Sequence, residues 1–256
     1  MRGFAAAALA AVTWTASAQS QSTRTRVDAS IGFAGIQHRD ATASPVSYAG
    51  FGGSLSLDVD RVGPMRRASL DMRVAVPRLS SSVTEAGYPR EEVSQGDLAV
   101  SLGWRVRRNA TRARLYLGPR LSFTNTYWRH IFPPNVGDEM GYLFANIALA
   151  PEVSGFSPVR QGTLEFRAAV PLVALVEHPY TDVRVIPPEG LQLRWATVTS
   201  FQQANLAVAY RRSFTRRVGW VARYRARVTR YVGAQPYRAA ENALDLGAVL
   251  GAGSAP

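Results

Sequence analysis

Residues 51–60 read FGGSLSLDVD, and residues 66–76 read RRASLDMRVAV. In both stretches an apolar residue alternates with a serine, an aspartate or an arginine. Successive side chains of a β-strand point to opposite faces, so each stretch predicts a strand with one apolar and one charged face. The fold therefore depends on which of these faces is turned toward water.

The same alternation recurs in about ten segments along the chain. Each segment has about the length of a tilted membrane-crossing strand, roughly 9–11 residues or a little more. No stretch has the roughly 18 or more consecutive apolar residues of a transmembrane helix. The predicted strands are residues 25–37, 47–60, 66–77, 97–107, 113–125, 141–153, 163–176, 200–211, 219–230 and 242–252.

The composition suits one large β domain. The chain has 256 residues, of which 46% are hydrophobic and 19% charged, and this balance excludes a disordered chain. The net charge is +12, and all 30 basic residues are arginine. A basic chain suggests nucleic acid as a partner, but these arginines alternate with apolar residues and form no groove with interleaved aromatic residues. We therefore expect no nucleic-acid partner.

The first 18 residues are expected to be a secretory signal peptide. Arg2 supplies a positive start, residues 4–14 an apolar stretch, and Ala-Ser-Ala at 16–18 a cleavage site before Gln19. Residues 19–24 would then form a short N-terminal segment, residues 25–252 a barrel, and residues 253–256 a tail. The sequence has no cysteine, so an exported chain of this size must be stabilised by a large core or by a membrane rather than by disulfides.

The connections between the predicted strands alternate in length. Those after even-numbered strands are short, for example DRVGPM and RRNATR, whereas most of those after odd-numbered strands are longer, for example TYWRHIFPPNVGDEM. An up-and-down meander puts the two sets at opposite ends. Short turns at one end and long loops at the other are typical of outer-membrane barrels, with the short turns in the periplasm.

The two faces of the predicted strands separate apolar from charged residues. Ile31, Phe33, Leu55, Leu57 and Trp104 are examples of the apolar face. The other face carries arginines 67, 73, 105, 107, 114, 120, 167, 211, 223, 225 and 227, together with Asp28, Asp58, Asp60, Asp71, Asp97, Glu152, Glu165 and Asp245.

Alternation alone does not decide which face is inside. A soluble exported ligand-binding β-barrel of the lipocalin kind would turn the apolar face inward, whereas an outer-membrane barrel turns it toward lipid. The export signal and the unequal connections favour lipid. So do Trp104, Tyr210 and Trp220, which lie on the apolar face close to short turns, where the bilayer interface would be.

Residues 25–252 thus resemble a small bacterial outer-membrane β-barrel. The resemblance implies an all-β, closed, up-and-down antiparallel transmembrane barrel of about ten strands, with eight and twelve as alternatives. It also implies an outer-membrane location, contact with outer-membrane lipids and lipopolysaccharide, and assistance from the barrel insertion machinery. It is a resemblance of architecture, so no functional residue of a known family is carried over. A barrel of this size has an interior near the side-chain-filled limit.

Two hypotheses follow for a charged lumen. The first is a structural network of ion pairs that plugs the barrel, because unpaired buried charge is costly. The second is a narrow, anion-preferring channel, because arginines outnumber carboxylates on this face. The candidate residues of this network are Asp28, Asp58, Asp71, Arg73, Arg105, Arg120, Glu152, Glu165, Arg167, Arg223, Arg225, Arg227 and Asp245.

A third hypothesis concerns the rim with the long loops. His38, His130 and His178 all fall at or near the start of long connections, with carboxylates nearby. A histidine oriented by a carboxylate beside a serine supports hydrolysis, as in a lipid A deacylase-like or omptin-like enzyme. No distinctive motif of either family is present. We expect no metal site, because no two histidines are close in sequence, and no cofactor.

Other rim residues suggest binding rather than catalysis. The loop TYWRHIFPPNVGDEM combines aromatic residues, a Pro-Pro pair and mixed charge, which suits ligand binding or a cover over the lumen. Arg39, Arg129 and Arg194 are placed to contact lipopolysaccharide phosphates by bidentate pairing.

Two features depart from the expected pattern. Pro119, Pro151 and Pro171 fall inside predicted strands, although proline cannot donate a ladder hydrogen bond. The chain also ends GAVLGAGSAP, without the aromatic residue that typically finishes the last strand of an outer-membrane barrel.

Overall fold

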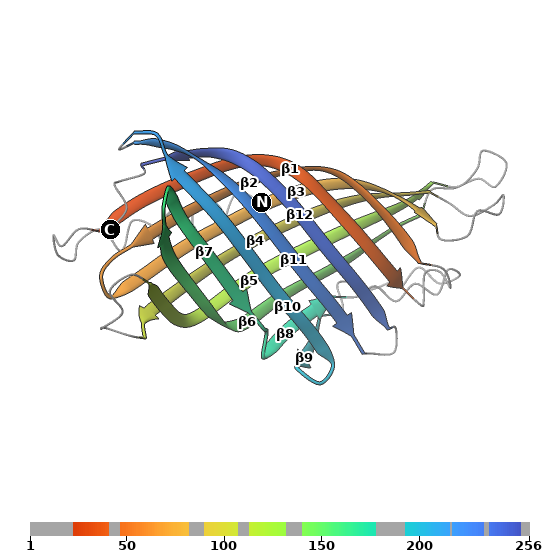
Figure 1. The fold of residues 1–256 in the computed structure, drawn as a ribbon. Coiled ribbons are helices and arrows are strands. Elements are labelled where there is room, and N and C mark those ends of the chain that lie inside the picture. The colour runs from red at the N-terminus through yellow and green to blue at the C-terminus, as the bar shows by residue number, and fades with distance from the viewer. Residues whose placement is uncertain are drawn as a thin grey trace, which may run out of the picture.

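A computed structural model describes residues 23–40, 47–81, 90–106, 113–131, 140–177, 193–215, 217–232 and 236–251. The chain is all-β in these ranges (Figure 1). No helix in the described part has the length and hydropathy needed to span a bilayer.

The described residues form twelve strands. They are β1 (Arg24–Asp40), β2 (Tyr48–Val62), β3 (Arg66–Ser81), β4 (Arg90–Arg105), β5 (Arg114–Ile131), β6 (Met140–Val159), β7 (Gly162–Ala169), β8 (Val173–Glu177), β9 (Leu193–Thr197), β10 (Phe201–Ser213), β11 (Val218–Tyr231) and β12 (Tyr237–Leu250).

Ten of these strands close into an antiparallel barrel. Neighbours along the chain pair from β1 to β7, β7 then pairs with β10, and β12 returns to pair with β1. Figure 1 shows the strands tilted around the closed ring. The predicted closed barrel of about ten strands is therefore confirmed. The closing strand is β12, which pairs with β1 from Tyr237 to Leu250 without a terminal aromatic residue.

The apolar face of the strands is turned outward. Ile31, Phe33 and Leu55 are 69%, 71% and 61% exposed, whereas Asp28 and Asp58 on the opposite face are 1% and 2% exposed. An inward-facing apolar cavity, as in a soluble barrel, is therefore excluded for the described strands. The fold has the inverted distribution of an outer-membrane barrel, with apolar side chains outside and polar ones inside.

One predicted strand is interrupted. Residues 163–176 form two strands, β7 and β8, which pair with different halves of β6. Between the pairs Glu152↔Ala169 and Leu149↔Val173, three residues that include Pro171 oppose two residues of β6. This extra residue is a bulge, which removes Pro171 from the ladder and accounts for its place inside the wall.

At the end with the long connections, strands extend farther than the sequence predicted, and one additional strand is present. β4 begins at Arg90 rather than residue 97, and β5 continues to Ile131. Strand β9, inside a predicted loop, pairs with β8 but is not part of the ten-strand ring. Pro119 and Pro151 lie opposite each other across β5 and β6, where neither has an N–H to donate.

Candidate functional site: the charged lumen

The half of the lumen near the short turns is filled by a dense cluster around Glu165 of β7. Among the described residues, four arginines contact this carboxylate. Arg67 Nη2 and Arg167 Nε donate to Oε1, each at 2.6 Å, and Arg26 Nη2 donates to Oε2 at 3.1 Å. Arg211 Nη1 also donates to Oε2. These side chains come from four strands, so Glu165 ties opposite sides of the barrel together.

Asp60 and Asp28 share the same arginines. Asp60 accepts hydrogen bonds from Arg26 at 2.5 Å, Arg67 at 2.7 Å and Arg167 at 2.8 Å. Asp28 accepts from Arg211 Nε at 2.8 Å and from Arg223 Nη2 at 2.8 Å. Each charge is thus matched by more than one partner, as a desolvated ion needs.

An aromatic ring lies against this cluster. The guanidinium carbon of Arg67 lies 4.8 Å from the centroid of the Phe156 ring, and that of Arg26 lies 5.9 Å from it. Tyr116 packs edge-on against Phe156 and donates its hydroxyl to the Gly63 carbonyl at 2.9 Å. The short-turn end of the lumen is therefore closed by charge and ring packing together.

A second group of ion pairs occupies the middle of the lumen. Arg120 Nη1 donates to Asp71 at 3.0 Å and to Glu152 at 2.7 Å, and Arg167 Nη1 donates to Asp71 at 2.5 Å. Arg223 and Arg225 both contact Asp58, the latter at 2.9 Å.

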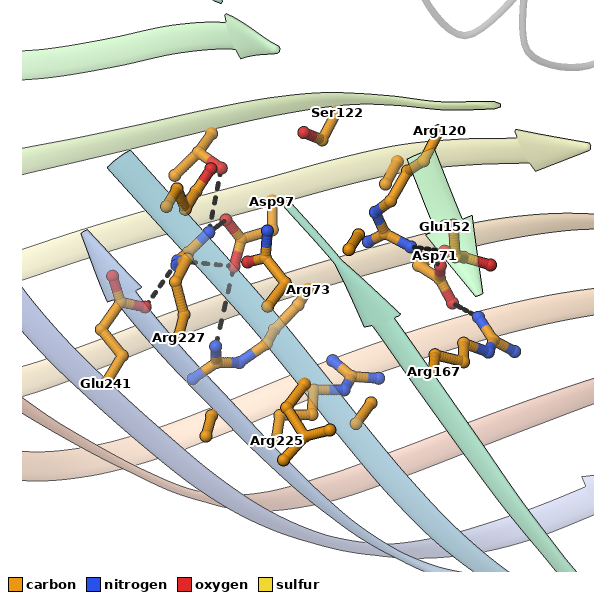
Figure 2. Close-up of a pocket in the computed structure, with 18 of the residues that line it drawn as sticks. Asp71, Arg73, Asp97, Arg120, Ser122, Glu152, Arg167, Arg225, Arg227 and Glu241 are labelled. Atoms are coloured by element: carbon orange, nitrogen blue, oxygen red, sulfur yellow. Dashed lines mark hydrogen bonds and ion pairs between the residues drawn. The ribbon is translucent and has the colours of Figure 1, made fainter. Parts of the chain in front are cut away.

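The third group lies nearer the long connections, and Figure 2 shows its members Asp97, Arg227, Arg73 and Glu241. Arg227 donates to both oxygens of Asp97, at 2.6 and 3.2 Å, and to Glu241 at 2.5 Å. Arg73 Nη1 lies 3.6 Å from the same Asp97. A cavity of about 110 Å³ separates this group from the middle one.

Beyond the cavity the lumen is filled by apolar side chains. Trp128 is 0%, Tyr48 1% and Phe144 3% exposed, and all three belong to one cluster with Leu79, Tyr237 and others. His38 is embedded in it, with its ring centroid 5.2 Å from that of Trp128 and 5.6 Å from that of Tyr48. Its Nε2 is 2.5 Å from Glu91 Oε2.

The structure places all thirteen residues of the predicted charge network on the inward face, buried or half-buried. Twelve of them have the ion pairs or hydrogen bonds described here. Asp245 accepts from Ser54 at 2.9 Å and lies 3.8 Å from Arg225. Arg105 is half-buried at the end of β4 and has contacts of its own.

The half-buried Arg26 and the buried Glu91 and Glu241 also contribute to the polar interior, although sequence reasoning did not select them. Arg26 precedes Asp28 by two residues and so shares its face, a signal that the pattern contained. Glu91 and Glu241 fell in segments predicted as loops, because the strands extend farther than their alternation shows.

Of the three predicted rim histidines, only His38 has a described side chain. His38 is 2% exposed inside the lumen rather than on a solvated rim. His130 lies in β5, but its side chain and all of His178 fall outside the described residues. Hydrolysis at His38 would require a substrate to reach a ring that Tyr48 and Trp128 cover. The described part of the chain holds no group of three metal-ligating side chains.

The predicted rim arginines are outside the lumen network. Arg39 and Arg194 are exposed, and Arg129 is half-buried with its Nη1 3.7 Å from Glu92.

Neither a family model nor a curated protein matches the chain. Among solved structures, it is similar to the translocator domain of the autotransporter NalP from Neisseria meningitidis, with a TM-score of 0.43, 10% identity and coverage of 96% of this chain and 94% of that one. Neisserial surface protein A gives a TM-score of 0.38, 11% identity, and coverage of 89% and 96%. Ail of Yersinia pestis gives a TM-score of 0.35 and 8% identity, with coverage of 89% of this chain and 99% of that one.

Proposed function

We propose that the protein is a structural barrel of the bacterial outer membrane whose lumen is closed to bulk flow. The outward apolar side chains support insertion in lipid, and the expected signal peptide supports export. Outer-membrane lipids, lipopolysaccharide and the barrel insertion machinery are the proposed partners. One observation supports the closed lumen. Two successive layers of side chains fill it, a charged layer near the short turns and an aromatic layer near the long connections.

The charged layer is costly to open. An open path past Glu165 requires its contacts with Arg67 of β3 and Arg211 of β10 to separate, both of which cross between strands. Breaking one buried pair costs about 3–5 kcal/mol when a charge is left uncompensated. Several pairs would have to open together, so thermal opening of this layer is rare.

The aromatic layer closes the other end independently. Trp128 and Tyr48 are at most 1% exposed, so neither side chain borders a water-filled path. Eight-stranded barrels have just enough room for side chains, and a ten-strand barrel lies near this limit. The interior therefore acts as a core that holds the barrel rigid.

A narrow anion-preferring channel is the second candidate. The supporting observation is the cavity, which within the described residues is lined by six arginines and five carboxylates. A passage through such a site would favour anions over cations. Anion passage would require both the charged layer and the aromatic layer to move.

Conductance in planar bilayers separates the two candidates. The refolded protein is inserted, and insertion is verified by the heat-shifted gel mobility of the same preparation in vesicles. We expect no steady conductance above that of protein-free membranes. Steady conductance would overturn the closed lumen, and a reversal potential favouring anions would establish the channel instead.

Lipopolysaccharide binding through Arg39, Arg129 and Arg194 is proposed from position alone. Replacing all three by glutamine should lower the amount of lipopolysaccharide that copurifies with the folded barrel. Unchanged copurification of this lipid would contradict the assignment.

A further inference from the structure

Three arginines form a row on the outer face of the barrel, near the long connections. Arg238 of β12 lies directly opposite Arg39 of β1 and, on its other side, directly opposite Arg230 of β11. The three strands are neighbours in the wall (Figure 1). All three side chains are exposed, and among the described residues none of them has an ion pair or a hydrogen bond.

This arrangement is unfavourable for the isolated chain. Directly opposite residues of an antiparallel pair have Cβ atoms about 4.5–5.5 Å apart, and like charges at such positions are destabilising. The adjacent connections, residues 41–47 and 232–236, contain no Asp or Glu. Asp40 is the acidic residue nearest to the row in sequence, and its side chain lies outside the described residues. An anion from outside the chain would offset the repulsion along the row.

The row lies just beyond the apolar band of the outer face. Near the short turns this band begins with Val27, Leu250 and Val218, which lie opposite one another on β1, β12 and β11. Arg39 is twelve residues after Val27. At roughly 3.3 Å per residue and a strand tilt of roughly 40°, this distance is roughly 30 Å along the membrane normal, compared with about 25 Å for the apolar band. The arginines are therefore at the level of the lipid headgroups.

We propose that this row binds phosphate groups of lipopolysaccharide, with Arg238 in the centre and Arg39 and Arg230 on either side. A guanidinium group binds two phosphate oxygens side by side, and such charge-assisted hydrogen bonds are stronger than neutral ones. Lipopolysaccharide carries phosphates on its lipid A headgroup, at the level where the row lies. The site rests on the outer-membrane location proposed above. Of the rim arginines proposed there, only Arg39 belongs to the row, whereas Arg129 has Glu92 at 3.7 Å.

The row predicts two effects of opposite sign for one substitution. Because β12 closes the ring and Arg238 faces an arginine on both neighbouring strands, repulsion acts on both pairings of the closing strand. Arg238→Gln removes the central charge, so without phosphate the urea midpoint of the barrel should rise or stay the same. The same substitution should weaken the stabilisation that bound phosphate provides.

Urea unfolding in vesicles of two compositions tests the site. Wild type and Arg238→Gln are folded into phosphatidylcholine vesicles that contain either phosphorylated lipid A or the same lipid A with its phosphates removed. Phosphorylated lipid A should raise the midpoint of the wild type. The amount needed for half of this rise should be at least about tenfold greater in Arg238→Gln, because one partner of the phosphate is lost.

Arg78→Gln is the matched control. Arg78 is also on the outer face near the long connections, and its side chain is 85% exposed, but it lies 3.9 Å from Glu92 and outside the row. This variant should respond to phosphorylated lipid A like the wild type. Heat-shifted gel mobility identifies the folded fraction of each protein.

Three results would overturn the proposal. The first is an equal response of wild type and Arg238→Gln to phosphorylated lipid A. The second is a lower midpoint of Arg238→Gln without phosphate, which would mean that the chain itself supplies a counter-charge to the row. The third is an equal rise on adding inorganic phosphate to vesicles with dephosphorylated lipid A, which would make the free ion the ligand. The row is outside the lumen, so this experiment and the conductance experiment fail or succeed separately.

Discussion

Replacing Glu165 by glutamine tests whether the lumen is held together by charge. The substitution keeps the shape of the side chain and removes one negative charge from the centre of four guanidinium groups. The Glu165 side chain is 2% exposed, and its contacts with Arg67 and Arg167 are both 2.6 Å. Breaking a buried ion pair by changing one partner costs about 3–5 kcal/mol. We expect the free energy of unfolding to fall by this amount.

Glu92→Gln is the matched control. Glu92 also has two arginine neighbours, with Arg129 at 3.7 Å and Arg78 at 3.9 Å, but its side chain is 41% exposed. Exposed pairs of this kind contribute about 0–1 kcal/mol. Glu92 thus has an exposed side chain and two arginines beyond hydrogen-bond distance, whereas Glu165 is buried and accepts hydrogen bonds from four, so the control measures what a loosely paired, exposed glutamate contributes.

Urea unfolding in lipid vesicles measures both variants. The folded fraction is followed by gel mobility without boiling and by tryptophan fluorescence, and unfolding and refolding curves are compared to establish reversibility. We expect a difference of about 3 kcal/mol in the free energy of unfolding between the variants, from the costs of breaking buried and exposed pairs. Equal, small losses would refute the reasoning, because they would mean that water screens Glu165 as it screens Glu92.

Two further substitutions test the lipid face and the aromatic layer. Leu55→Arg places a charge on the outer face in the middle of β2 and should destabilise the barrel by about 2–4 kcal/mol in vesicles. Ser80→Arg, near the end of β3, should cost about 0–1 kcal/mol. Equal costs would contradict a bilayer around the middle of the strands. Trp128→Ala removes a side chain that is 0% exposed and should cost about 3–5 kcal/mol. Trp195→Ala, at a position 77% exposed, should cost less, and the reverse order in urea unfolding would place Trp195 rather than Trp128 in the core.

The sequence predicted the wall of the barrel because a strand with one lipid face leaves a period-two signal. All ten strands of the ring were identified, and Leu55, Asp58 and Arg73 fall on the expected faces. The ends of the strands were predicted less well. At the end of the barrel with the long connections, the inward face is apolar like the outward one. There Val93, Trp128 and Tyr237 point inward, so the contrast between the faces is lost.

The interruption of the wall could not be placed from the sequence. Pro171 signalled an irregularity, but only the pairing partners on β6 show that it is a bulge between β7 and β8. In strand β9 the exposed Leu193 and Trp195 precede a single buried residue, Ala196, a pattern too short to distinguish from a loop.

The partners within the lumen also depend on three-dimensional closure. Arg167 and Asp60 are far apart in sequence and on strands that are not neighbours, so no local rule pairs them. The face of each residue could be predicted, but the choice of partner across the barrel could not.

Single-cysteine labelling along residues 51–60 tests the central claim most directly. The chain has no cysteine of its own, so each substitution carries the only label. In vesicles, labels at 51, 53, 55, 57 and 59 should be quenched by lipid-soluble agents, and labels at the even positions should be shielded from them. The opposite parity, or water accessibility at all ten positions, would contradict a barrel with its apolar face in lipid and its charges in the lumen.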